Sequence, residues 1–258
     1  MGVLARRGAT SILVGVFMIG LPHVAESRPY AAQAQKSAAQ GGRRPTITGG
    51  QDGKSAWMVA GYRQLQVRKR SFREPQQIVT ELRAGSDVVN LTVSPEAVTV
   101  TRNGRTIVID SAQAMESLQQ LLGGSAAVFA TKMLLSELEA ESDLEAPEMS
   151  LLSVAAFVAS LVGDIEAPRR LSDRFVAKHR GLLRQIGGGG NGSCWSNYTV
   201  ELTGAWGELQ TCMDESRDDP WWWAPIQRLS CNGIWLMRSE SAWFEYLKCV
   251  SPMSNLPH

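Results

Sequence analysis

The spacing of the four cysteines constrains the fold of this chain more than any other feature. Cys194, Cys212, Cys231 and Cys249 are separated by 18, 19 and 18 residues, and the first 193 residues contain no cysteine. Eighteen residues make about five turns of an α-helix, so each pair at that spacing lies on one line along a helix. In an antiparallel pair of helices, residues that face each other have residue numbers with a constant sum. This sum is the same for Cys194 with Cys249 as for Cys212 with Cys231, so both pairs fit one antiparallel register. We therefore predict a helical hairpin stapled by Cys194–Cys249 and Cys212–Cys231 disulfides.

The apolar stripes of the two predicted helices favour the same pairing. Trp195 and Trp206 belong to the first stripe, and Trp235 and Trp243 belong to the second. The cysteines precede the stripe by a similar angle in both helices, which puts them on the same side of an antiparallel pair and on opposite sides of a parallel one. The competing interpretation is a metal site of four thiolates, but the chain has no Cys-x-x-Cys pair of the kind typical of such sites.

The N-terminal residues 1–27 predict a signal peptide. They contain the basic pair Arg6 and Arg7, the apolar stretch Ser11–Leu21 and the small-x-small sequence Ala25-Glu26-Ser27. The alternative is an uncleaved membrane anchor, for which the apolar stretch is short, because a span needs about 18 apolar residues. We expect the mature chain to be secreted or periplasmic.

Composition and charge argue against an intrinsically disordered chain and against a nucleic-acid-binding protein. The chain is 44% hydrophobic and 20% charged with a net charge of +1, which is typical of a folded globular protein and gives no overall basic field for nucleic acid. Residues 28–73 carry ten Lys and Arg residues and one acidic residue. Either this segment contacts an acidic surface or it pairs with the acidic remainder of the chain, and we favour the second interpretation.

The first half of the mature chain predicts a sheet. Residues 28–54 are rich in Ala, Gln, Gly and Ser and are expected to form a flexible lead-in. Residues 55–110 contain alternating apolar segments that predict an antiparallel β-meander of four or five strands, and Asn103-Gly104 predicts a type I′ hairpin turn. The apolar residues at even spacing in the first of these segments are Trp57, Val59, Leu65 and Val67.

The second half predicts helices. Residues 111–186 contain about four helical segments that should pack on the meander, and Glu148–Gly163 is apolar nearly all round and should be buried. Residues 187–193 form a Gly-rich linker, and residues 194–258 form the Trp-rich, disulfide-stapled helical hairpin. The sequence therefore predicts an α+β fold class, in which a sheet precedes a helical bundle and the hairpin comes last.

Three adjacent tryptophans form the candidate partner-binding site. Trp221, Trp222 and Trp223 follow Asp218 and Asp219 in the connection between the two predicted helices. Three consecutive rings cannot all point inward, so at least one is exposed or packs on another surface. That surface is either the sheet-and-helix part of this chain or a protein partner, a cell-envelope surface or a membrane interface. The acidic flank disfavours anionic lipid.

One short motif indicates a different chemistry. Gly192-Ser193-Cys194-Trp195-Ser196 resembles the nucleophile segment of papain-like cysteine peptidases, in which a cysteine begins a helix. The resemblance implies a nucleophilic Cys194 activated by the helix N-terminus and by a histidine farther along the chain. The sequence departs from that pattern at Asn191, where the family has a cysteine, and the only histidine after Cys194 is the terminal His258.

These observations favour an exported, non-catalytic interaction protein that presents the Trp-rich hairpin. One alternative is a precursor that releases its last 65 residues as a toxic or antimicrobial peptide, and a second is an enzyme with Cys194 as nucleophile. We expect no cofactor, because the glycines of the linker lack the Lys-Ser/Thr of a phosphate-binding loop. We expect no metal, because the acidic run at residues 137–148 lacks the pattern of a calcium loop.

Overall fold

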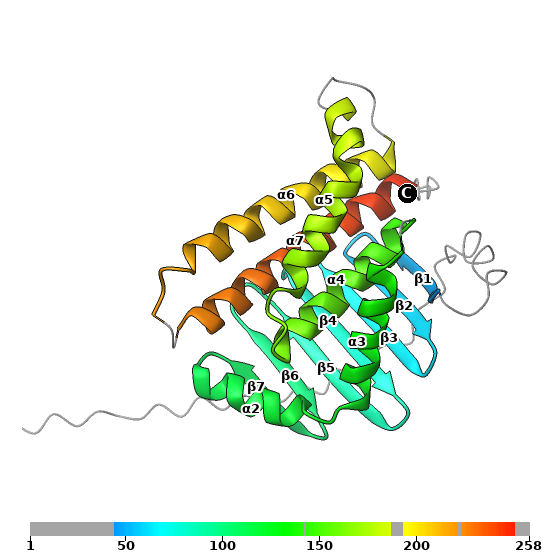
Figure 1. Ribbon diagram of the computed structural model, residues 1–258. Coiled ribbons are helices and arrows are strands. Elements are labelled where there is room, and N and C mark those ends of the chain that lie inside the picture. The colour runs from blue at the N-terminus through cyan, green and yellow to red at the C-terminus, as the bar shows by residue number, and fades with distance from the viewer. Residues whose placement is uncertain (1–43, 142, 187–192, 221–222, 251–258) are drawn as a thin grey trace, which may run out of the picture.

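The chain folds as one antiparallel sheet followed by helices that gather on one face of that sheet (Figure 1). The computed structural model describes residues 44–141, 143–186, 193–220 and 223–250. The predicted signal peptide (1–27), most of the predicted lead-in (28–54) and nearly all of the glycine linker (187–193) lie outside the described residues. The predicted α+β fold class is confirmed.

The sheet has seven strands in the order of the sequence, and each strand pairs antiparallel with the next. The predicted meander is confirmed, but the predicted number of four or five strands is wrong. The strands are β1 (Thr46–Gln51), β2 (Ser55–Tyr62), β3 (Leu65–Phe72), β4 (Gln77–Ala84), β5 (Asp87–Val93), β6 (Val98–Arg102) and β7 (Arg105–Ile109).

Strand β1 lies inside the segment that the sequence predicted as a flexible lead-in. Its residues Thr46–Gln51 include two glycines, which weaken the strand signal, yet all six residues pair with β2. At Gly49 a Cβ atom would lie 2.9 Å from the carbonyl oxygen of Trp57 and 3.5 Å from the ring of Trp243. The glycine therefore allows the first strand to approach the last helix closely.

A tight turn divides the first predicted segment of the meander, which runs from Trp57 to Val67, into the two strands β2 and β3. Arg63 has a positive φ of 51° in this turn, and the inward-facing positions change from even to odd numbers across it. Leu65 and Val67 are buried as expected, whereas Trp57 and Val59 lie on the outer face of the sheet. The predicted turn at Asn103-Gly104 is present, and both residues have the positive φ of a type I′ turn.

The six helices of the described residues occupy the same side of the sheet (Figure 1). Their bounds are α2 (Ala112–Leu122), α3 (Ala126–Glu139), α4 (Ala146–Leu161), α5 (Ala167–Ile186), α6 (Cys194–Glu215) and α7 (Ala224–Val250). Helices α3, α4 and α7 touch the sheet, α2 packs near its β7 edge, and α5 and α6 form an outer layer.

Helix α4 is the central helix, and all of its residues except Pro147 are buried. It touches the sheet and helices α2, α3, α5 and α7, so no side of it faces water. This confirms the prediction of a buried helix from its continuous apolar sequence. Its first turn is closed by a capping box between Glu145 and Glu148.

One carboxylate ties α3 to the sheet. Asp87, at the start of β5, accepts hydrogen bonds from the Ser125 hydroxyl at 2.6 Å and the Ala127 amide at 3.0 Å, and it pairs with Arg102 at 2.8 Å. Burial alone would raise the pKa of Asp87, but these hydrogen bonds and the Arg102 charge lower it.

The basic segment near the N-terminus pairs with acidic residues from the rest of the chain. Arg44 lies 3.6 Å from Glu148, and Arg63 lies 2.6 Å from Glu137. Two further pairs join the sheet to α7, and these are Lys69–Glu240 and Arg73–Glu245. The interpretation that residues 28–73 are complemented within the chain is therefore confirmed for these four residues.

Candidate functional site

The two disulfides join α6 and α7 with the predicted pairing. Cys194 bonds Cys249 with a Cα–Cα distance of 5.6 Å, and Cys212 bonds Cys231 with a distance of 5.7 Å. The helices are antiparallel, so each bond closes one end of the hairpin (Figure 1). The two bonds indicate that the chain folds in an oxidising environment.

Local hydrogen bonds explain how a Thr-rich sequence forms α6. Ser193 caps the helix by accepting from the amide of Ser196. The hydroxyls of Thr199, Thr203 and Thr211 each donate to the carbonyl oxygen four residues earlier, so these β-branched side chains are satisfied within the helix.

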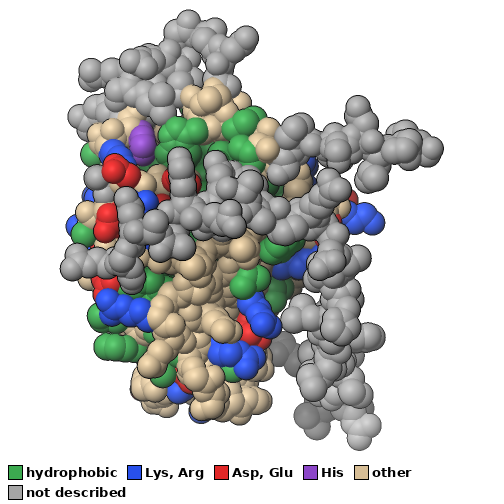
Figure 2. Space-filling view, turned by 90° about the vertical axis from the view of Figure 1, so that its right-hand side faces the viewer, with side chains coloured by type: hydrophobic (Ala, Val, Ile, Leu, Met, Phe, Trp, Pro, Cys, Tyr) green, Lys and Arg blue, Asp and Glu red, His purple; other side chains and the backbone are tan. Residues whose placement is uncertain are grey.

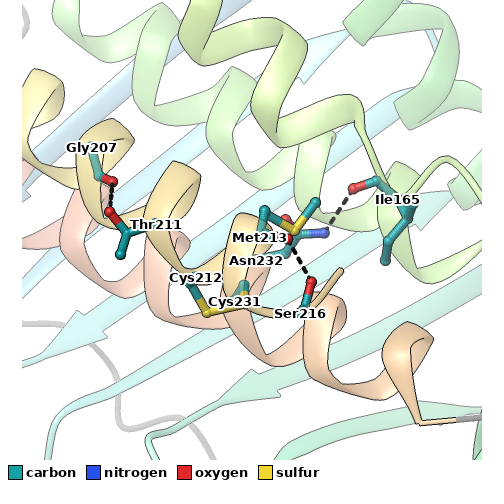
Figure 3. Close-up of a disulfide and its surroundings, with 8 residues drawn as sticks. All are labelled: Ile165, Gly207, Thr211, Cys212, Met213, Ser216, Cys231 and Asn232. Atoms are coloured by element: carbon teal, nitrogen blue, oxygen red, sulfur yellow. Dashed lines mark hydrogen bonds between the residues drawn. A yellow bond between two sulfur atoms is a disulfide. The ribbon is translucent and has the colours of Figure 1, made fainter. Parts of the chain in front are cut away.

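The inner disulfide lies where the hairpin meets the rest of the molecule. Figure 3 shows Cys212 and Cys231 beside Asn232, whose side-chain amide donates to the carbonyl oxygen of Ile165 at 3.0 Å. Ile165 belongs to the connection between α4 and α5. At this end of the hairpin, the disulfide therefore joins α6 to α7, and the Asn232 hydrogen bond joins α7 to the α4–α5 connection.

The structure places one of the three predicted partner-binding tryptophans. Trp221 and Trp222 lie outside the described residues. Trp223 comes directly before α7, its amide donates to the carbonyl oxygen of Pro220 at 2.8 Å, and 37% of the residue is exposed. It is the most exposed tryptophan of the described residues, because Trp235 and Trp243 are almost fully buried and Trp57, Trp195 and Trp206 are half-buried.

Two tryptophans, Trp195 and Trp243, belong to an aromatic row through the helical layers. The rings of Phe175, His179, Trp195, Tyr198 and Tyr246 follow one another with centroids 4.5–5.6 Å apart, and Trp243 ends the row stacked on the last tyrosine. Figure 2 shows hydrophobic side chains gathered beside a histidine on the upper part of one face of the molecule. The row is mainly packing, because pairs of this geometry stabilise a core.

The peptidase chemistry implied by the motif at Cys194 is not present. A cysteine nucleophile requires a free thiolate, and the Cys194 sulfur is bonded to Cys249. The nearest described histidine, His179, has its ring 5.6 Å from the ring of Trp195, and burial and the neighbouring Lys178 lower its pKa. The motif at residues 192–196 reflects a capped helix start that carries a disulfide cysteine.

A buried polar network lies between the sheet and α7, and the sequence analysis missed it. Lys69 on β3 donates to Glu240 on α7 at 2.6 Å, and its side chain is 0% exposed. The hydroxyl of Ser150 on α4 also contacts the Lys69 ammonium and donates to Glu240 at 3.0 Å, and the hydroxyl of Ser71 donates to the second carboxylate oxygen at 2.9 Å. Burial lowers the pKa of Lys69, although the Glu240 charge opposes the shift.

The network forms the base of a cleft. This cleft has a volume of about 290 Å³ and lies between the β3–β4 connection and α7. Ser71 and Glu240 reach it from the network, and its other lining residues are Phe72, Arg73, Glu74, Gln76, Gln77, Ile78, Met237, Ser241 and Phe244.

Within the described residues, no group of three or more His, Cys, Asp or Glu side chains could hold a metal ion. No single described helix is both long and apolar enough to cross a membrane. Helices α2 and α3 meet that criterion only as a pair that is bent by 91°.

Comparison with known proteins adds no relationship. No protein-family model, curated protein or solved structure matches the chain.

Proposed function

We propose that the mature chain is exported from the cytoplasm and acts outside it as a non-catalytic binding protein. The N-terminal pattern of residues 1–27 and the oxidised state of all four cysteines support export. The binding element is the connection between α6 and α7, and its partner is a protein outside the cytoplasm.

The observation that carries this proposal is an exposed tryptophan on a rigid support. Trp223 comes directly before α7, the helix that carries Cys231 of the inner disulfide, and it is far more exposed than Trp235 and Trp243 of that helix. Tryptophan is among the residues most enriched at the anchor points of protein interfaces. A support that is already ordered loses little conformational entropy when a partner binds. Asp214 pairs with Arg217, and the further acidic residues Asp218 and Asp219 in the connection favour a partner with basic groups at the rim of the interface.

The precursor alternative is less compatible with the packing. Helix α7 contributes Trp235, Leu236, Trp243 and Leu247 to the common core, and Glu240 is the counter-charge of the buried Lys69. Release of the hairpin would expose this apolar face and leave the ammonium of Lys69 unpaired in the interior. We therefore favour an intact mature chain.

Site-specific photocrosslinking in the source cells tests the proposal. A photoreactive phenylalanine analogue replaces Trp223 in one variant and Val200 in a control variant, because Val200 is similarly exposed on the middle of α6. We expect a discrete crosslinked protein band from position 223 and none from position 200. Absence of a band at position 223, or equal bands at both positions, would refute a binding role for this end of the hairpin.

A further inference from the structure

The cleft beside α7 has the construction of a binding site. One wall contains Gln76 of the β3–β4 connection and Gln77 at the start of β4, and the other is a single face of α7 that includes Ser241 and Phe244. Its volume of about 290 Å³ suits a small molecule with a single ring. The polar groups at its base come from different elements, which converge only in the folded chain.

The base of the cleft is held by a network that stability alone does not explain. A buried ion pair contributes little net stability, because removing two charges from water costs about as much as their attraction returns. Lys69 and Ser150 hold one oxygen of Glu240 from beneath, while the other oxygen faces Ser71 at the cleft. A perturbed ionisable group with a fixed partner at the base of a cleft is a frequent sign of a functional site.

We propose that this cleft binds a neutral, polyhydroxylated molecule of the size of one sugar ring, whose hydroxyl groups donate to Glu240 and Ser71. The proposal concerns a site separate from the hairpin connection, so either can be correct without the other.

The unused hydrogen-bonding capacity at the base determines the class of ligand. A carboxylate oxygen accepts two hydrogen bonds, and within the described residues Oε2 of Glu240 accepts one, from Ser71. The Ser71 hydroxyl donates its proton in that bond, so its oxygen is left as an acceptor. The base therefore offers two acceptors side by side and matches a ligand that brings donors.

The charge balance at the base favours a neutral ligand. Lys69 neutralises Glu240 directly below the cleft. Arg73 and Glu74 both line the cleft, and Glu245, which pairs with Arg73, also pairs with Lys248, so the positive and negative groups around the cleft balance. A charged ligand would meet no net opposite charge and would lose its hydration on entering. The side-chain amides of Gln76 and Gln77 and the hydroxyl of Ser241 can both donate and accept, as hydroxyl groups require.

Three sugars that differ mainly in charge test the ligand class. The full mature chain, labelled with ¹⁵N, is titrated with glucose, glucuronate and glucosamine, and the side-chain amide signals of Gln76 and Gln77 are followed by NMR. We expect glucose to shift these signals with a Kd in the millimolar range, as is usual for so small a ligand, and to bind more tightly than either charged sugar. Tighter binding of a charged sugar, or no shift with glucose, would overturn the assignment.

A matched pair of variants tests the location. Ser241→Tyr fills the cleft, and Ser230→Tyr places the same side chain at an exposed position on the same helix outside it. We expect Ser241→Tyr to weaken glucose binding at least about tenfold and Ser230→Tyr to leave it unchanged. Equal effects of the two variants, or no effect of Ser241→Tyr, would refute this site. A parallel titration with maltotriose distinguishes a free sugar from the end of a sugar chain as the ligand. A site that takes the terminal ring of a chain binds maltotriose at least as well as glucose, whereas a site closed around one free sugar binds it more weakly.

Discussion

Replacement of Glu240 should be among the most destabilising single changes in this chain. Glu240→Met removes the counter-charge of Lys69, whose side chain is fully buried, and it also removes the acceptor used by Ser71 and Ser150. Breaking a buried pair from one side typically costs about 3–5 kcal/mol, because the remaining charge is left uncompensated. We expect Lys69→Met to cost a similar amount for the same reason.

The double variant Lys69→Met/Glu240→Met should recover most of that loss. It removes both charges together, and replacing a buried pair by apolar side chains of similar volume is often neutral or stabilising by about 1–4 kcal/mol. The hydroxyls of Ser71 and Ser150 then lack their acceptor, which costs about 1 kcal/mol each. The double variant should therefore lie within about 2 kcal/mol of the parent chain.

Urea unfolding with both disulfides intact measures these differences through tryptophan fluorescence. The control is Glu245→Met on the same helix, which removes a half-exposed partner of Arg73 and should cost less than about 1 kcal/mol. If the two single-variant losses simply add in the double variant to within about 0.5 kcal/mol, the two charges do not depend on each other and the reasoning is wrong.

Two further predictions concern the disulfides and the acid stability. Replacing the Cys194–Cys249 pair with serines should cost about 4 kcal/mol and replacing Cys212–Cys231 about 3 kcal/mol, because the first bond closes 55 residues of chain and the second 19; midpoints of urea unfolding provide the comparison. Asp87→Asn should cost about 1–2 kcal/mol at neutral pH. The pKa of Asp87 lies below 3.8 in the folded chain, so its carboxylate contributes its full stability above pH 3.8 and progressively less as the pH falls through the lowered value. Urea unfolding of the variant at several pH values should therefore show a weaker loss of stability in acid than the parent chain shows. An unchanged acid dependence would contradict this role of Asp87.

The cysteine register was predictable because helical geometry is regular over long distances. An 18-residue spacing returns to the same side of any α-helix, so the cysteine positions, together with the apolar stripes that favour an antiparallel pair, specified which cysteines could meet. The buried α4 and the Asn103-Gly104 turn were predictable for a similar reason, since each depends on residues that are close in sequence.

The features that sequence reasoning missed depend on contacts between distant residues. Lys69 occupies an inward position of β3 between Val67 and Ser71, which is a visible anomaly, but its partner Glu240 is 171 residues away. No local pattern shows that these two groups meet. Strand β1 was missed because its stability comes from pairing with β2 and from the close approach of α7 at Gly49, rather than from its own side chains.

The sequential order of the sheet has a consequence for how this chain acquires its structure. Every pair of neighbouring strands is also consecutive in the sequence, so the seven strands can assemble hairpin by hairpin with short loops and little entropic penalty. Helix α7, which closes the interior over β1 and β2, however, follows all the other described elements in the sequence. A chain emerging from its N-terminus would hold a nearly complete sheet with Lys69 still in water, and desolvation of that ammonium becomes one of the final steps of folding.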